Sequence, residues 1–286
     1  MKLSVIATNF LAATIKQRVP GSAPIYALAR RIVAAYENND VNIDSNGEAW
    51  LLGKLFEGRP IVALDVGANE GDWTAVALKA GRDCTVYCYE PVPTTFAVLQ
   101  ANTTDGRAKL FNKALSSEPG TLEINSVVGA STLSSVVDFG KYASSLQVEK
   151  IQIEASTGDR ELQALGLTHV DMLKVDVEGH DLDVLLGFKT SLAEGRIDVI
   201  QFEYNIFTHM TQRSLREFYD LLWGDFLICR LLPNGLEACR YHTNLEDYRQ
   251  TNWIALRRAI IDPALVSRLR IRPARGQSPE ELGYPA

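Results

Sequence analysis

Cysteine and histidine are scarce in this 286-residue chain, which contains four of each. No two cysteines form a Cys-x-x-Cys pair, and no pair of histidines at zinc-ligand spacing lies beside them, so neither a zinc site nor any other metal site is predicted. Cys84 and Cys88 lie in an apolar run typical of a buried strand. We therefore expect reduced thiols in the core of a cytoplasmic protein.

A basic excess and a long apolar run are also missing. The formal net charge is −6 and the isoelectric point is near 5.4, which argues against a nucleic-acid-binding surface. No apolar stretch is long enough to cross a bilayer, and residues 1–8 resemble a signal peptide only faintly. We expect a soluble chain that acts on a small-molecule or glycan acceptor, with homo-oligomer formation left open.

The balance of 46% apolar and 22% charged residues is that of a globular protein. Residues 1–57 are predicted to form a helical N-terminal extension, because Ile25, Leu28 and Ile32 recur at helical spacing. This extension would either cap one face of the main domain or form a dimer contact. Residues 58–259 are predicted to form the main domain. Residues 260–286 are expected to be a solvated C-terminal tail, which carries Arg268, Arg270, Arg272 and Arg275.

From residue 60 onwards, apolar strands alternate with helices, which predicts an α/β domain with a mostly parallel, doubly wound sheet. Later strands without a helical crossover predict an antiparallel edge, and the run at 121–124 is expected to be an added edge strand. Residues 126–160 are harder to interpret and suggest a polar loop. The main strands are expected at 61–65, 84–89, 109–114, 170–176, 198–203, 226–232 and 252–256.

Residues 64–74 form the first motif, a strand that enters a glycine turn and opens a helix. Its glycines are spaced Gly-x-x-x-Gly after a leading acid, Asp65, and differ from the Gly-x-Gly-x-x-Gly of nicotinamide binders. A carboxylate suits the positive sulfonium and zwitterionic methionine of S-adenosylmethionine better than it suits a pyrophosphate. Glu90 follows 25 residues after Asp65, at the end of the next strand, where an acid accepts hydrogen bonds from ribose hydroxyls.

Two further motifs lie at the ends of later strands. Asp176, Glu178 and His180 leave the same strand end, where a desolvated group would become a general base, although His180 is equally able to brace the following helix. Glu203 and Asn205 would orient an acceptor hydroxyl, a reading we favour over the alternative in which Glu203 and Asp176 ligate a divalent cation.

Together these runs resemble the FkbM family of methyltransferases. The resemblance is carried by residues 64–71, 89–91, 112–115 and 173–179 and by Phe202-Glu203, and it covers roughly residues 60–256. It implies a Rossmann-like, class I methyltransferase fold, with a mostly parallel seven-stranded sheet, and methyl transfer from S-adenosylmethionine to a hydroxyl oxygen. Known substrates of the family include polyketide macrocycles and sugars of surface glycans.

The resemblance also implies roles for particular residues. The glycine turn would contact the methionine part of the cofactor, Glu90 its ribose and residues 112–115 its adenine, while Asp176 and Glu178 would face the methyl group and the acceptor. The cofactor contacts are expected from Asp65, Gly67, Ala68, Asn69, Gly71, Asp72, Trp73, Thr74, Glu90, Pro91, Asn112, Ala114 and Asp176. The catalytic residues are expected to be Asp176, Glu178 and His180, and the acceptor-binding residues Glu203, Tyr204 and Asn205.

The sequence departs from the family pattern at two places. Residues 154–159 replace a usual Thr-Leu-Asp element, and His180-Asp181 replaces a small residue followed by an acid. We predict O-methylation of a glycan sugar or a polyketide-like natural product. The alternatives are N-methylation on the same fold, a nicotinamide-dependent oxidoreductase, and a scaffold that binds the cofactor without turnover.

Overall fold

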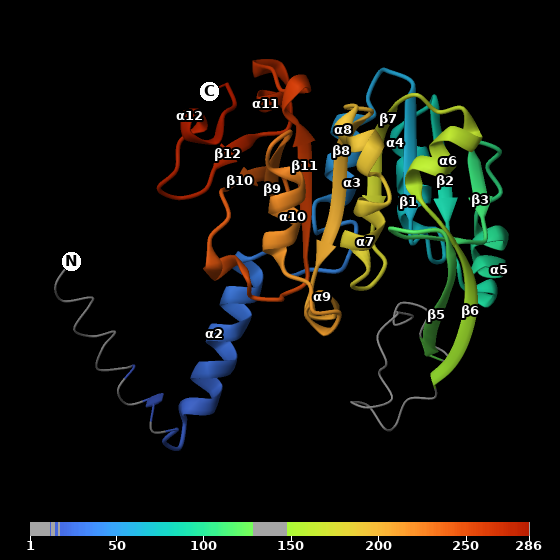
Figure 1. The fold of residues 1–286 in the computed structure, drawn as a ribbon. Coiled ribbons are helices and arrows are strands. Elements are labelled where there is room, and N and C mark those ends of the chain that lie inside the picture. Colours follow the sequence, from blue (N-terminus) through green and yellow to red (C-terminus); the bar gives the residue numbers. More distant parts are fainter. Residues whose placement is uncertain (1–11, 13–14, 17, 128–147, 286) are drawn as a thin grey trace.

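The computed structural model describes residues 12, 15–16, 18–127 and 148–285 (Figure 1). Within this part of the chain, the main sheet has nine strands in the order β12-β10-β9-β11-β8-β7-β1-β2-β3. Helices cover both faces of the sheet, which confirms the α/β class and the Rossmann-like arrangement.

One half of this sheet is parallel. Strands β7, β1, β2 and β3 pair in parallel from one neighbour to the next, and β8 joins β7 in the same sense. Every residue of β7 and β8 is buried, because helices cover both faces. The chain order reverses at β1, so the loops after β1 and β7 flank the crevice where such sheets bind ligands. The parallel strands are β1 (Ile61–Val66), β2 (Cys84–Tyr89), β3 (Ala108–Phe111), β7 (Val170–Val175) and β8 (Ile197–Tyr204).

The other half contains the expected antiparallel edge. Strand β11 (Thr251–Arg257) lies between β8 and β9 (Phe226–Leu232) and is antiparallel to both. Strand β10 (Gly235–Ala238) extends this edge as a hairpin with β9, and β12 (Ile271–Pro273) pairs in parallel with β10. These last two strands bring the total to nine instead of the expected seven.

The expectation of a solvated C-terminal tail is wrong for most of residues 260–286. Besides β12, this segment forms η4 (Arg258–Ile260), α11 (Pro263–Arg268) and α12 (Pro279–Leu282). Leu269 and Leu282 are buried in the core, whereas the four arginines are solvent-exposed. The proline and glycine content of the segment obscured a short apolar pattern that packs on the sheet.

A second, three-stranded sheet in the described residues has the order β4-β6-β5, from β4 (Ala114–Leu115), β5 (Gly120–Val127) and β6 (Val148–Ser156). The strand expected at 109–114 is therefore divided into β3 and β4, because Asn112 turns away to donate from Nδ2 to the carbonyls of Glu90 and Pro91. The run at 121–124 belongs to this second sheet and does not extend the main one. Of the predicted polar loop at 126–160, residues 128–147 lie outside the described part.

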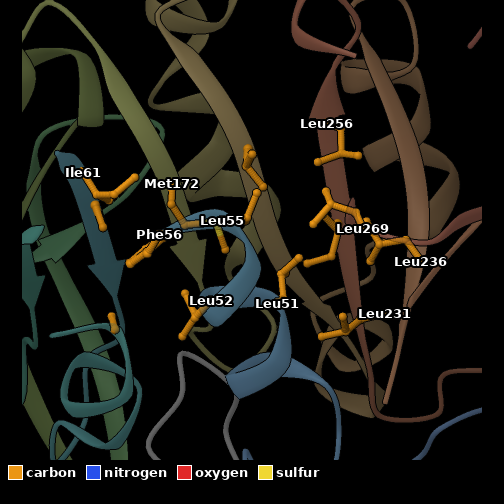
Figure 2. Packing of buried hydrophobic residues seen from close by; sticks show 14 of the residues in the cluster. Leu51, Leu52, Leu55, Phe56, Ile61, Met172, Leu231, Leu236, Leu256 and Leu269 are labelled. Atoms are coloured by element: carbon orange, nitrogen blue, oxygen red, sulfur yellow. The ribbon is translucent and has the colours of Figure 1, made fainter. Parts of the chain in front are cut away.

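The helices that follow the strands build two apolar clusters, one on each face of the main sheet. Helix α3 (Glu48–Leu55) covers one face, where Leu51, Leu52 and Leu55 lie over sheet residues such as Met172 (Figure 2). The other helices of the domain are α4 (Asp72–Ala80), α5 (Pro93–Asn102), α6 (Gly158–Leu165), α7 (Asp181–Leu186), α8 (Lys189–Ala193), α9 (Ile206–Met210), α10 (Leu215–Leu222) and η3 (Thr243–Leu245).

Helix α2 (Ser22–Tyr36) extends away from the rest of the molecule (Figure 1). It is joined to the domain just after its last turn, where Glu37 pairs with Arg230 and Asn38 Nδ2 donates to the carbonyl of Leu231 at 3.0 Å. Among the residues that the structure describes, no helix combines the length and the apolarity needed to cross a membrane.

Candidate active site

A cavity of about 730 Å³ opens at the carboxyl ends of β1, β7 and β8. Its walls come from the loop after β1, the end of β2, the turn after β7 and the second sheet. Its volume falls in the range of small-molecule sites. All four of the strand-end motifs found in the sequence contribute to its wall, with Gly67, Glu90, Glu178 and Glu203 among the lining residues.

The glycine turn after β1 is held by backbone geometry that only glycine tolerates. Gly67 has a φ of 79°, and a Cβ there would approach the carbonyl oxygen of Asp176 to 1.9 Å. The amides of Gly67 and Ala68 donate to the carbonyl of Tyr89 at 2.9 and 3.0 Å. The turn is therefore packed directly against the end of β7, and both strand ends share one cavity wall.

Asp65 and Lys174 form a buried ion pair beneath this turn. Lys174 Nζ lies 3.1 Å from Oδ1 of Asp65 and 3.5 Å from Oδ2 of Asp176, and it donates to the carbonyl of Gly67 at 2.9 Å. Burial alone would lower the pKa of Lys174, but the two carboxylates outweigh it and raise the pKa. Thr74 Oγ1 donates to the other oxygen of Asp65 at 2.7 Å.

Glu90 joins the glycine turn to the end of β2. Its Oε2 accepts from the amide of Asn69 at 3.1 Å and its Oε1 from the amide of Val92 at 2.9 Å. Burial raises the pKa of Glu90 to about 7, against the lowering effect of these two hydrogen bonds. The carboxylate lines the cavity and keeps further acceptor capacity for a bound hydroxyl.

Three carboxylates meet on the part of the wall formed by the ends of β7 and β8. Asp176, Glu178 and Glu203 offer oxygens that all lie within 4.8 Å of one another. Glu203 also accepts from Asn205 Nδ2 and, at 2.9 Å, from Gln250 Nε2. Burial and the neighbouring carboxylates raise the pKa of Glu178 to about 8 and the pKa of Glu203 well above its usual range. This wall favours a neutral or cationic ligand over an anionic one.

His180 lines the same cavity, and each of its ring nitrogens lies near a polar group. Nε2 is 2.9 Å from Oγ of Ser116, and Nδ1 is 3.6 Å from Oδ2 of Asp183, which in turn accepts from Arg213 at 2.8 Å. Burial lowers the pKa of His180, Asp183 opposes this shift, and Arg213 adds to it. The imidazole is therefore held neutral near pH 7, the state in which it is able to accept a proton.

Most of the residues predicted for the site lie on the cavity wall. They are Gly67, Ala68, Asn69, Asp72, Trp73, Glu90, Pro91, Ala114, Asp176, Glu178, His180 and Glu203.

The others do not line the cavity, and a direct ligand contact is not supported for them. Asp65 and Thr74 are fully buried in the ion-pair network described above. Tyr204 donates to Glu246 at 2.6 Å, and Asn205 caps α9. Gly71 and Asn112 likewise do not line the cavity. The sequence motifs identified the loops that line the cavity. Which side chains of these loops face the cavity depends on the alternation of side chains along each strand and on the shape of each turn.

Several lining residues were missed from the sequence. Lys174 was visible as a lysine inside an otherwise apolar strand, a pattern that signals a buried ion pair. The remainder had no local signal, because contacts between distant segments bring them to the site. They include Val41, Asn42, Ile43, Glu48, Leu122, Ile124, Ile153, Ile206 and Gln250.

Comparison with known proteins agrees with this site. The model of the methyltransferase FkbM domain matches residues 65–241, which include every strand-end motif described above. The chain belongs to the FkbM family of methyltransferases. Its cofactor is S-adenosylmethionine, and the nicotinamide alternative is wrong because the matched family transfers methyl groups.

Among curated proteins, this FkbM methyltransferase is similar to the 2-O-methyltransferase NoeI of Sinorhizobium fredii. The two are 26% identical over 195 residues, which cover 64% of this chain and 79% of that protein. Among solved structures, an rRNA methylase from Streptococcus thermophilus matches with a TM-score of 0.43 and 8% identity, covering 76% of this chain and 98% of that one. An S-adenosylmethionine-dependent O-methyltransferase from Thermotoga maritima gives 0.40 and 13%, with coverage of 73% and 64%.

The residues around the cavity fit the cofactor of the family. Gly67 and the carboxylate of Glu90 both line the cavity. The indole Nε1 of Trp73 is a buried donor with no hydrogen-bond partner in the described part, and Trp73 lines the cavity. A ligand that accepts this hydrogen bond would remove the cost of leaving it unmade. The surplus of carboxylates suits a cationic sulfonium.

Proposed function

We propose that the protein transfers a methyl group to a hydroxyl oxygen of a neutral acceptor, either a glycan sugar or a polyketide-like natural product. The observation that carries this proposal is the meeting of His180 with the carboxylates of Asp176, Glu178 and Glu203 on one cavity wall. The likeness to a protein named a 2-O-methyltransferase supports transfer to oxygen. The cytoplasmic location expected from the reduced thiols remains a prediction.

In this proposal, the wall formed by Gly67, Asn69, Trp73 and Glu90 holds the cofactor. Ionised Glu90 accepts hydrogen bonds from ribose hydroxyls, and Trp73 Nε1 donates to an oxygen of the ligand. Asp65 acts from behind the wall, because it holds Lys174 and, through it, the carbonyl of Gly67. When bound, S-adenosylmethionine supplies an activated methyl group on a sulfonium, so most of the catalysis is positioning of the acceptor.

The part of the wall at the ends of β7 and β8 would bind the acceptor. An alcohol is a weak nucleophile until its proton is removed, and neutral His180 accepts that proton through Nε2 once the acceptor hydroxyl replaces Oγ of Ser116. Asp183 stabilises the imidazolium that forms, from 3.6 Å at Nδ1. The other hydroxyls of the acceptor donate hydrogen bonds to Asp176, Glu178 and Glu203. A protonated Glu178 also donates one.

The test is incubation of the purified protein with S-adenosylmethionine and a panel of neutral sugars, amino sugars and macrocyclic alcohols. The expected product carries one added methyl group by mass and an O-methyl resonance by NMR. His180→Ala should slow its formation by a factor on the order of 10² to 10⁴, and His242→Ala, at an exposed histidine, serves as the matched control. A methyl group on nitrogen, found only with the amino sugars, would contradict transfer to oxygen and establish the N-methyl alternative.

A further inference from the structure

Helix α2 exposes an unusual amount of apolar surface. The structure describes all of its 15 residues, and none of them is buried. Tyr36, at the end of the helix, is 75% exposed. In the described part of the chain, eight of the ten exposed large apolar side chains fall within residues 19–41. They are Val19, Ile25, Tyr26, Leu28, Ile32, Val33, Tyr36 and Val41. A patch of this kind marks a surface that another body covers.

Four of the large apolar side chains of α2 share one face. At about 100° per residue, Ile25, Leu28, Ile32 and Tyr36 fall within a sector about 80° wide. The two arginines of the helix, Arg30 and Arg31, lie on the other side of the helix. An apolar face flanked by arginines is the arrangement of helices that lie in the headgroup region of a bilayer.

Basic and acidic residues are unevenly distributed along the chain. Residues 1–36 contain five basic residues and no acidic residue. The remaining 250 residues hold 24 of the 29 basic and all 35 acidic side chains, so their formal net charge is −11. Residues 1–36 therefore complement an anionic surface. Such a surface repels the rest of the protein, and α2, which extends away from the domain, keeps the two apart.

The helix also lies close to the cavity. Val41 and Ile43, a few residues after α2, line the cavity wall, and so does Ile206, which is 50% exposed. In Figure 1, α2 extends beyond the carboxyl ends of β1 and β8, on the side where the cavity opens. A flat surface that binds α2 would face the mouth of the cavity.

We propose that α2 docks the protein on an anionic lipid bilayer, with its apolar face in the headgroup region and Arg30 and Arg31 at the anionic headgroups. A second copy of the chain fits less well, because pairing two α2 helices would bring together two copies of a segment, residues 1–36, that carries five basic and no acidic residues. Tyr26 and Tyr36 also suit the interface, since a tyrosine combines an apolar ring with a polar hydroxyl. This docking is independent of the identity of the methyl acceptor.

The test is co-sedimentation of the full chain with vesicles of 70% phosphatidylcholine and 30% phosphatidylglycerol, and with vesicles of phosphatidylcholine alone. We expect binding to the anionic vesicles that weakens at high salt. Each arginine at such a surface changes the affinity about fivefold, so Arg30→Gln with Arg31→Gln should reduce binding about 25-fold. The matched control is Arg268→Gln with Arg275→Gln, two exposed arginines in the C-terminal segment.

A second variant, Leu28→Ser with Ile32→Ser, should also bind the anionic vesicles more weakly. Its melting temperature should equal that of the wild type, because both side chains are exposed. Equal binding to the two kinds of vesicle, or no binding to either, would overturn the proposal. So would a dimer seen by light scattering without lipid that the same variant dissociates, because a second copy would then be the body that covers α2.

Discussion

Lys174 Nζ lies 3.1 Å from Oδ1 of Asp65, so one buried ammonium joins the ends of the neighbouring parallel strands β1 and β7. Asp65 is fully buried and Lys174 is 4% exposed, and neither side chain has water to replace its partner. The same ammonium donates to the carbonyl of Gly67. The shape of the glycine turn is therefore tied to a buried charge pair whose lysine also lines the cavity.

Lys174→Met should destabilise the protein strongly, because it leaves the carboxylate of Asp65 buried without its partner. Breaking a buried pair in this way costs about 3–5 kcal/mol. Chemical denaturation monitored by tryptophan fluorescence would measure the change in the free energy of unfolding. Lys79→Met, at an exposed lysine of α4, is the matched control and should change it by less than about 0.5 kcal/mol. If the two variants lose the same free energy of unfolding, the buried pair contributes no more to stability than an exposed lysine does.

Two carboxyl groups, Glu178 at the cavity and the buried Asp181 in the helix that follows it, make stability depend on pH. The pKa of Glu178 is raised to about 8 and that of Asp181 to about 7, so both groups bind more protons in the folded than in the unfolded state. Their contribution is complete below the unfolded pKa, near 4, and is lost as the pH rises through 7 and 8. The melting temperature should therefore fall between pH 5 and pH 8.

Glu178→Gln should flatten this fall, because a neutral amide does not ionise. Glu118→Gln, at an exposed glutamate, should leave it unchanged. Differential scanning calorimetry at several pH values would measure both, with about 2–4 °C expected for each kcal/mol. A melting temperature of the Glu178 variant that follows the wild type at every pH would show that Glu178 ionises normally.

The sequence was sufficient to predict the parallel strands and the motifs at their ends, because a run such as residues 170–175 has the continuous apolar character of a strand buried on both faces. It was not sufficient to predict which side chains face the cavity. Tyr204 is directed to Glu246, 42 residues away, and Ile153 reaches the wall through the pairing of β5 with β6. Such contacts depend on distant segments, which local periodicity does not record.

The setting of His180 predicts a specific pH response. Asp183 raises the pKa of His180 against the lowering effect of burial, so Asp183→Asn should lower that pKa further. If neutral His180 is the base, the acidic limb of the kcat profile moves to lower pH in this variant. His180→Ala should reduce kcat by a factor on the order of 10² to 10⁴ while cofactor affinity stays nearly unchanged. Steady-state rates measured from pH 5 to 9, with an acceptor found in the panel, would check both. If the acidic limb of the Asp183→Asn profile stays at the pH of the wild type, the base is a group other than His180.

Glu90 predicts a pH dependence of cofactor binding itself. Its pKa is raised to about 7 by burial, so the carboxylate is largely protonated at pH 6 and ionised at pH 8. A protonated acid accepts hydrogen bonds from ribose hydroxyls less well than a carboxylate does. The affinity for S-adenosylhomocysteine should therefore rise between pH 6 and pH 8.

Glu90→Gln removes this titration, so its affinity should be lower than that of the wild type at pH 8 and nearly independent of pH. The loss expected for one charged hydrogen bond of about 1.5–3 kcal/mol is roughly 10- to 100-fold. Isothermal titration calorimetry at the two pH values would measure it, with Glu118→Gln again as the control. An affinity that rises equally in the wild type and in Glu90→Gln would place the titrating group elsewhere in the cavity, where Glu178 is the next carboxylate to replace.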